Sequence, residues 1–218
     1  MEHTAPARPL FEERESAILA AARELFQRED WELVTIDEIA AKAQIGKGTV
    51  YKHVASKDEL YARLAMEIDR RLLARIEAID DAAPPLDQLA AYTAAFWQLA
   101  DLPPEERNLM QYCGRVSFRR RLPVPMRADW GMIEQQLRDR LLAILRAGVN
   151  AELIEPRPDD LLLFGVQSAL HGAVRLAWRS GSGTGRPERT TELTRFILMG
   201  LLTKQGRKQL KKGLALSP

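Results

Sequence analysis

The sequence contains a single cysteine, Cys113, among 218 residues. One cysteine cannot form an intrachain disulfide, and this composition is typical of proteins from a reducing compartment. The thiol could serve as a redox sensor, but no second cysteine is present to resolve an oxidised form, so packing in the core is favoured. We therefore expect a cytoplasmic protein.

Signals for membrane insertion, export and catalysis are also missing. No apolar run approaches the roughly 18 residues of a transmembrane helix, and the first residues, MEHTAPARP, lack a signal-peptide core. The histidines His3, His53 and His171 are scattered, and there is no HExxH, GxSxG, CxxC or phosphate-loop motif. We expect no membrane association, no metal or other cofactor, and no catalytic residues.

Acidic residues are absent from one short stretch that is rich in lysine. Residues 39–56 contain no Asp or Glu, whereas Lys42, Lys47 and Lys52 fall within them and Lys57 follows at once. Lysines that neutralise DNA phosphates release counterions and supply most of the non-specific affinity. Taken alone, such lysines more often form a solvated surface. Because residues 1–60 carry a net charge of −4, only this local patch argues for DNA.

The sequence around this stretch contains two capping-box motifs, each of which predicts the N-terminus of a helix. Thr35 and Glu38 form a capping box, in which a hydroxyl and a carboxylate satisfy free N–H groups at a helix start. Ser56 and Glu59 form a second.

Between the two starts, apolar spacing predicts a short helix over residues 36–43, a turn over 44–46 and a second helix over 47–54. Two short helices joined by a glycine-containing turn describe a helix-turn-helix.

Several side chains of the second helix suit DNA. Gly48 costs about 1 kcal/mol relative to alanine inside a helix, which indicates that another molecule approaches the backbone. Thr49 offers a hydroxyl to a phosphate and a methyl group to a thymine. Tyr51 and His53 add donors, although each alone more often packs, and Lys57 lies at a helix N-terminus that attracts anions. The predicted DNA-binding residues are Thr35, Lys47, Gly48, Thr49, Tyr51, Lys52, His53 and Lys57.

This ordered set resembles the N-terminal DNA-binding domain of the TetR/AcrR family of transcriptional regulators. The resemblance covers about residues 14–64 and rests on Thr35, Gly48-Thr49-Val50-Tyr51, His53 and the run from Ser56 to Leu60. It implies an all-α fold of about nine helices, with a homeodomain-like helix-turn-helix domain and a C-terminal helical domain for ligand binding and dimerisation. It also implies a double-stranded DNA operator, a small-molecule effector and repression.

The sequence departs from the family pattern at two positions. Gln44 stands where glycine is usual in the turn, and Val54 stands where phenylalanine is usual. Gln44 bears on the backbone conformation of the turn. Val54 predicts a smaller contact with the core than phenylalanine would make.

The rest of the chain is predicted to be helical, with proline and glycine marking the breaks. The expected helices are Ser56–Ile79, Leu86–Leu102, Glu105–Arg120, Arg127–Ala147, Asp159–Arg179 and Pro187–Lys204. The predicted domains are residues 1–60 for DNA binding, 61–204 for effector binding and dimerisation, and 205–218 as a basic, flexible tail. The tail lysines and arginine could reach phosphate, but a solvated chain end is favoured.

The last two predicted helices are apolar on more than one face, so they must be buried by more than their own domain. In the resembled family these helices pair with those of a second subunit, which predicts a homodimer; an intrachain hairpin is the alternative. The predicted interface residues are Phe164, Ser168, Gly172, Leu176, Phe196 and Met199.

The middle helices concentrate aromatic and methionine side chains, a composition that suits a pocket for a lipophilic effector but also an ordinary core. The predicted effector-binding residues are Phe96, Trp97, Met110, Tyr112, Phe118 and Trp130. The sequence thus predicts a ligand-responsive DNA-binding regulator. An all-α carrier of lipids or other small molecules, without DNA binding, is the alternative.

Overall fold

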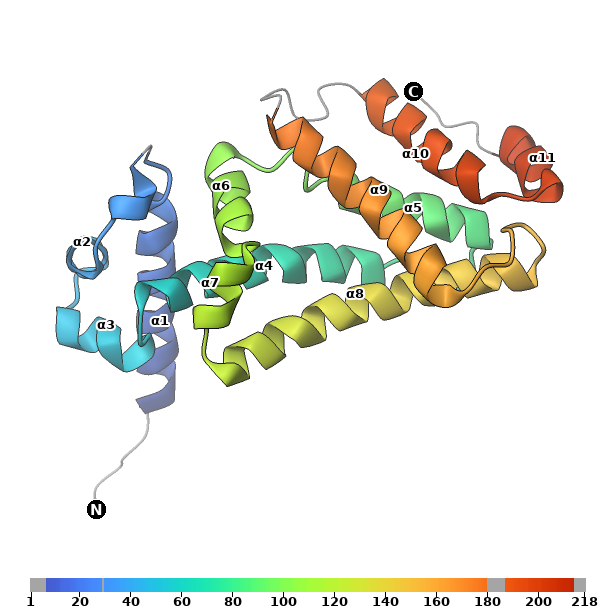
Figure 1. The fold of residues 1–218 in the computed structure, drawn as a ribbon. Helices are drawn as coiled ribbons and strands as arrows, with labels where there is room; N and C mark the ends of the chain where they lie inside the picture. The colour runs from blue at the N-terminus through green and yellow to red at the C-terminus, as the bar shows by residue number, and fades with distance from the viewer. Residues whose placement is uncertain (1–6, 29, 180–186, 214–218) are drawn as a thin grey trace, which may run out of the picture. The chain divides into compact units, whose positions relative to one another are not determined.

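The computed structural model describes residues 7–28, 30–179 and 187–213 (Figure 1). Within these ranges the chain forms eleven α-helices, one 3-10 helix and no strand, which confirms the predicted all-α class. The elements in chain order are α1 (Ala7–Leu25), η1 (Trp31–Leu33), α2 (Ile36–Lys42), α3 (Lys47–His53), α4 (Lys57–Glu77), α5 (Pro85–Trp97), α6 (Pro104–Cys113), α7 (Val116–Arg121), α8 (Val124–Asn150), α9 (Asp159–Arg179), α10 (Pro187–Leu201) and α11 (Lys204–Gly213).

The described residues form two more α-helices than the nine that the sequence predicted. The helix expected over residues 105–120 is divided into α6 and α7, because Arg115 adopts an extended conformation at the N-cap of α7. The second addition is α11, which occupies most of the segment predicted to be a flexible tail.

The helices divide into two compact units whose boundaries fall inside α4 and α8. Unit 1 contains the described residues up to Ile68 together with Pro103–Ala128, and unit 2 contains Asp69–Leu102 and the described residues from Asp129 onward. This division differs from the predicted contiguous domains, because α6 and α7 group with the helix-turn-helix.

A chain of aromatic rings holds α6 and α7 in unit 1. The ring of Tyr61 on α4 lies 4.7 Å from that of Phe26, 5.3 Å from Trp31 and 5.5 Å from Tyr112 on α6. Tyr112 in turn lies 5.2 Å from Phe118 on α7. The tilted and edge-on geometries are those that aromatic quadrupoles favour. Residues far apart in sequence therefore form one core.

Arg121 adds polar contacts to the same junction. Its Nε donates to Asp58 Oδ2 at 2.7 Å, and its other nitrogens donate to the Ser117 carbonyl and the Tyr112 hydroxyl, both at 3.3 Å. The guanidinium thereby joins the C-terminal end of α7 to the first turn of α4.

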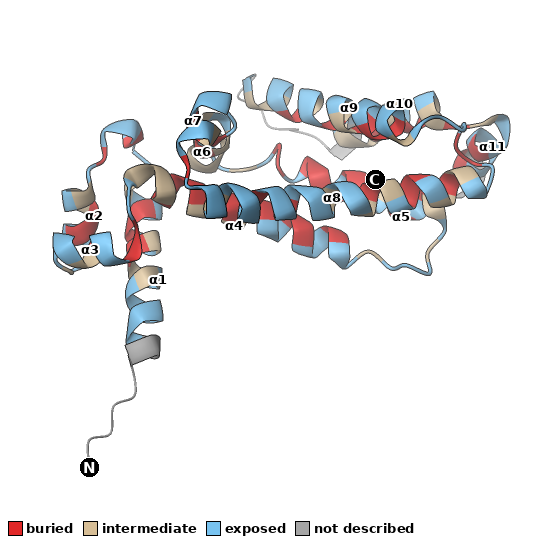
Figure 2. Cartoon of the chain, turned by 60° about the horizontal axis from the view of Figure 1, so that its bottom comes forward, coloured by how far each residue is buried: buried red, intermediate tan, exposed pale blue. Residues whose placement is uncertain are grey.

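In unit 2, α9 and α10 pack against α5, whose inner face is almost fully buried (Figure 2). Buried tryptophans find polar partners here, as their N–H groups require. Trp97 Nε1 donates to Thr194 Oγ1 at 2.8 Å, and Trp130 Nε1 donates to Asp69 Oδ2 at 2.7 Å.

The start of α11 is fixed to the loop that follows α8. Thr203 Oγ1 donates to the Glu152 carbonyl at 2.7 Å and accepts the Gly206 N–H at 3.0 Å. A Cβ at Gly206 would lie 2.1 Å from the Leu153 carbonyl oxygen, so only glycine permits this approach. The predicted flexible tail is therefore wrong for the described part of this segment.

One helix, α9, is long and apolar enough to cross a membrane by length and composition alone, with a mean hydropathy of 1.2. Part of it is buried against its own unit: Leu162, Leu163, Val166, Leu170 and Val174 are all covered. The remaining apolar residues form an exposed stripe, described below.

Candidate nucleic-acid interface

The first capping box positions α2. Thr35 Oγ1 accepts the Glu38 N–H at 3.2 Å, and the Glu38 carboxylate accepts the Thr35 N–H at 2.8 Å, which confirms the predicted reciprocal pair. Glu38 also accepts a hydrogen bond from Arg28 at 2.8 Å. The helix start is thus tied to the segment that follows α1.

The turn between α2 and α3 uses a left-handed residue. Gln44 has a φ of 57°, and the next N–H, that of Ile45, donates to the Ala40 carbonyl at 3.0 Å. This conformation favours glycine because a Cβ crowds the neighbouring carbonyl oxygen. The departure of Gln44 from the family pattern therefore leaves the turn intact and places its strain on one residue.

Helix α3 has a buried face and an exposed face. Val50 and His53 are buried, whereas Lys47, Gly48 and the half-exposed Tyr51 face solvent, and so does Lys52. A Cβ at Gly48 would meet no atom within 4 Å, so the protein itself does not require glycine there. The exposed set recurs at helical spacing and forms one surface, which we call the α3 face (Lys47, Gly48, Tyr51 and Lys52).

The charge of the α3 face is partly neutralised by the domain itself. Lys47 Nζ lies 2.9 Å from Asp37 Oδ2, and this carboxylate raises the pKa of the lysine. Both groups are more than half exposed, so solvent screens the pair and an incoming phosphate can replace the carboxylate.

Two predicted DNA-binding residues point inward. His53 is 7% exposed, and its ring packs against that of Phe11 in a tilted arrangement with a centroid separation of 3.9 Å. Lys57 Nζ donates to the carbonyls of Glu32 and Val34, at the end of η1. These side chains hold the helix-turn-helix together, and sequence spacing alone could not show that they turn away from solvent.

The second predicted capping box is present in altered form. Ser56 Oγ accepts the Glu59 N–H at 3.2 Å, as expected, but the Glu59 carboxylate accepts the N–H of Ala55 rather than that of Ser56. The same carboxylate also pairs with Arg63 at 2.7 Å.

The residues predicted to bind an effector do not lie together in one unit. Met110, Tyr112 and Phe118 belong to unit 1, where the two rings complete the aromatic core. The other three, Phe96, Trp97 and Trp130, are buried in unit 2.

Unit 2 instead contains an open groove of about 600 Å³, which the sequence analysis did not identify. It lies between the C-terminal end of α4 and the outer side of α5, and alanines form most of its apolar lining. The lining residues are Arg75, Ala78, Ile79, Asp80, Ala83, Asp87, Gln88, Ala91, Ala94, Ala95 and Gln98.

The residues predicted to form a dimer interface lie at the surface of α9 and α10 (Figure 2). Phe164, Leu176 and Phe196 are 71%, 66% and 80% exposed, and Ser168 and Gly172 are exposed between the first two. Met199 is half-buried. Large apolar side chains at this exposure are uncommon on the surface of a single soluble chain.

A capped short helix, a tight turn and a second helix with an exposed basic face define a helix-turn-helix of the kind that binds DNA. Residues 18–64, which contain all of these elements, match the family model of the bacterial regulatory proteins, tetR family. The helix-turn-helix segment of this chain is thus similar to the DNA-binding segment of this family of transcriptional regulators.

Relatives share the fold over most of the chain. An uncharacterised HTH-type transcriptional regulator of Haemophilus influenzae is 26% identical over 156 residues, which cover 71% of this chain and 78% of that protein. The TetR-family regulator PfmR of Thermus thermophilus has a TM-score of 0.63 at 21% identity, covering 83% of this chain and 94% of PfmR. A TetR-family regulator of Haemophilus influenzae Rd has a TM-score of 0.60 at 19% identity, covering 90% of this chain and 100% of that protein.

We expect the capping box to make stability depend on acid pH. The Thr35 N–H, then Arg28 and the Thr35 hydroxyl, lower the pKa of Glu38 from 4.5 to about 2. Stabilisation by this carboxylate is therefore complete above pH 4.5 and is lost as the pH falls toward 2. Glu38→Gln should lower the urea midpoint at neutral pH, and its difference from wild type should shrink through this window. Glu13→Gln, at an exposed glutamate of α1, is the control; a difference for Glu38→Gln that is independent of pH would contradict the assignment.

Proposed function

We propose that this regulator is a cytoplasmic repressor that binds a pseudo-palindromic operator as a homodimer and is released by a small hydrophobic effector. The observation that carries the DNA-binding part is the α3 face: two lysines, a glycine and a tyrosine exposed on a helix whose other side is buried. An α-helix of this kind fits the major groove of a duplex.

The exposure and contacts of the predicted DNA-binding residues support different roles for them. Lys47 and Lys52 neutralise phosphates, Thr49 and Tyr51 donate from their hydroxyls, and Gly48 lets the helix approach the duplex closely. Thr35 contributes by fixing α2 through its capping box. His53 and Lys57 act as positioning residues, because their side chains are engaged within the unit.

We expect Lys47→Ala combined with Tyr51→Phe to weaken operator binding without unfolding the chain, since both side chains are at least half exposed. In a mobility-shift assay with DNA from upstream of the protein's own coding region, the affinity should fall. The slope of log K against log salt should decrease by about 0.9 for the lost lysine. Arg70→Ala, at an exposed arginine of unit 2, is the matched control.

A second variant, Gly48→Ala, should weaken DNA binding while it makes the free protein more stable. The methyl group meets no protein atom, so the free protein should gain up to about 1 kcal/mol, while DNA binding should weaken. If Gly48→Ala is more stable and binds DNA as tightly as wild type, the proposal that Gly48 lets α3 approach the duplex closely is wrong. Unchanged affinity in both variants would contradict the use of the α3 face.

The exposed stripe on α9 and α10 supports the homodimer. Leu161, Phe164, Leu176 and Phe196 are each more than half exposed within a single chain. The small residues Ser168 and Gly172 between them allow another helix to approach. A second copy can cover this surface symmetrically and presents two reading heads to a two-fold operator.

The combined substitutions Phe164→Glu and Phe196→Glu should convert the dimer into a monomer, because two carboxylates would then be buried at the interface. Light scattering at micromolar concentration should give the chain mass of 24.6 kDa for the variant and twice that for wild type. Val124→Glu, at an exposed apolar residue of unit 1, should leave the mass unchanged. A wild-type protein of monomeric mass would refute the dimer.

The alanine-lined groove is the candidate effector site in unit 2. Its volume lies in the range of small-molecule pockets, and its lining combines six apolar residues, five of them alanines, with five polar or charged residues. Arg75, Ala78 and Ile79 on the groove lie at and just beyond the C-terminal end of α4, the helix whose first turn follows α3. An effector with unequal affinity for two positions of α4 would shift operator affinity.

Ala91→Trp should fill this groove and abolish the response to effector while leaving operator binding intact. The measurement is operator affinity across a panel of hydrophobic compounds, first for wild type and then for the variant. Ala74→Trp, at an exposed alanine of α4 outside the groove, is the control. Operator affinity that no compound in a broad panel changes would contradict effector control, and a variant that still responds would place the site elsewhere.

A carrier of lipids or small molecules would account for an apolar groove but not for the α3 face. The mobility-shift assay above separates the two functions, because a carrier should bind no DNA.

A further inference from the structure

The C-terminal helix α11 concentrates positive charge on one side. Its ten residues include no Asp or Glu and five basic residues at positions 204, 207, 208, 211 and 212. At about 100° per residue, these positions fall within an arc of about 140°. Gly206 and Leu210 fall on the opposite side. We call these five positions the α11 stripe.

The orientation of this helix is fixed by its packing. Gly206 is buried against the Leu153 carbonyl, the Thr203 hydroxyl caps the helix start, and Leu210 is 92% buried. A chain end that only needs to stay solvated requires none of these contacts. The buried side packs within unit 2, and the basic residues Lys204, Arg207 and Lys208 are exposed on the other side.

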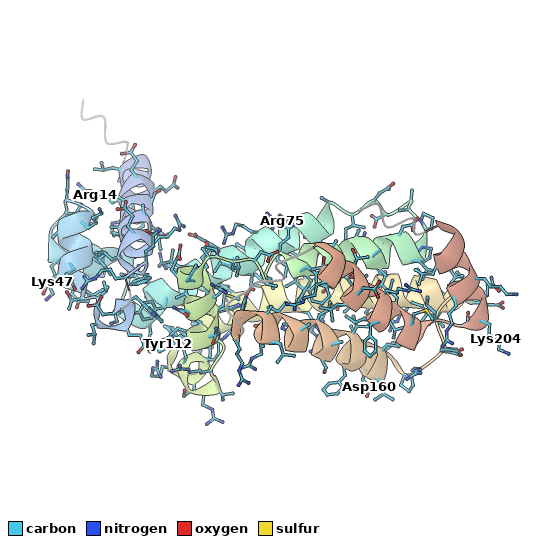
Figure 3. The ribbon with its side chains drawn as sticks, turned by 90° about the horizontal axis from the view of Figure 1, so that it is seen from above. Arg14, Lys47, Arg75, Tyr112, Asp160 and Lys204 are labelled. Carbon is cyan, nitrogen blue, oxygen red and sulfur yellow. The ribbon has the colours of Figure 1, made fainter. Side chains whose placement is uncertain are left out.

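The described lysines of the stripe are available to a partner. Lys204, which is labelled in Figure 3, and Lys208 are both exposed. Within the described ranges, neither lysine forms an ion pair with a carboxylate. Gln205 and Gln209 are exposed beside them. The Arg207 guanidinium is directed toward the carbonyls of Leu202 and Met199, which it reaches at 3.1 and 3.3 Å.

We propose that the α11 stripe is a second DNA-contact surface, which binds the phosphate backbone of a duplex without reading its sequence. Lys204 and Lys208 lie about one helical turn apart, about 6 Å along the helix, and position 212 continues the same spacing in the sequence. A duplex is a linear polyanion, and lysines that neutralise its phosphates release counterions. The flanking glutamine amides suit phosphate and sugar oxygens.

The surface of α11 argues against a lipid bilayer as the partner. A helix that lies in a membrane interface exposes large apolar side chains next to its basic face. Among the residues of α11 with described side chains, the one large apolar residue, Leu210, is buried.

The test uses the full chain with the α3 face disabled, so that its result does not depend on operator recognition. Tyr51→Ala and Lys52→Glu, both at exposed positions, provide this background. Fluorescence anisotropy at about 50 mM salt measures its binding to a labelled duplex of arbitrary sequence. The background chain should bind, and adding K204Q, K208Q, K211Q and K212Q should weaken binding at least tenfold. The slope of log K against log salt should fall by up to about 3.6.

A matched variant removes the same charge elsewhere in unit 2. R70Q, R138Q, R157Q and R189Q replace four exposed arginines outside α11 and should change duplex affinity less than twofold. Equal affinity of the α11 variant and the background chain would overturn the proposal. It would also be overturned if the background chain bound anionic vesicles or polyglutamate but not the duplex.

Discussion

The packing of Tyr61 against Phe26, Trp31 and Tyr112 is the interaction on which the DNA-binding unit depends. These rings come from the segment after α1, from η1 and from α6, and they meet on a residue of α4 that is 1% exposed. Helices shorter than about 12 residues are marginal when isolated. The seven-residue α2 and α3 therefore rely on packing within unit 1, where Ile39 and Ala40 of α2 and Val50 and His53 of α3 are buried.

Ion pairs within unit 1 partly neutralise its lysines. The lysines that suit DNA are paired within the free domain: Lys47 with Asp37 and Lys42 with Glu24. Such exposed pairs are weak, so they neutralise the surface without blocking it. A segment with a net charge of −4 over residues 1–60 thus presents cations locally at Lys42 and Lys47.

Local signals in the sequence were sufficient for the helix-turn-helix. The box of Thr35 and Glu38, the turn at Gln44 and the exposed Gly48 depend on residues within one or two helical turns, and the structure shows the expected geometry. The inward turns of His53 and Lys57 depend on Phe11 and on the η1 carbonyls, more than 20 residues away. Spacing within α3 and α4 carries no information about such contacts.

Non-local packing also decided the larger features that the sequence did not predict. The assignment of α6 and α7 to unit 1 rests on rings separated by about 50 residues or more, and the groove arises where α4 and α5 approach each other. In contrast, the sequence pattern of α9 and α10, which is apolar on more than one face, agrees with the exposure of Phe164, Leu176 and Phe196, because the pattern around a helix can be determined from that helix alone.

The contact between Gly206 and the Leu153 carbonyl has a consequence for comparing sequences. Any side chain at this position forces α11 away from the loop after α8, so glycine there is a marker for the docked helix. Relatives with another residue at the matching position must place their C-terminal segment differently, even where the rest of the fold superimposes. Glycine at this position is thus a requirement for the docked placement of α11.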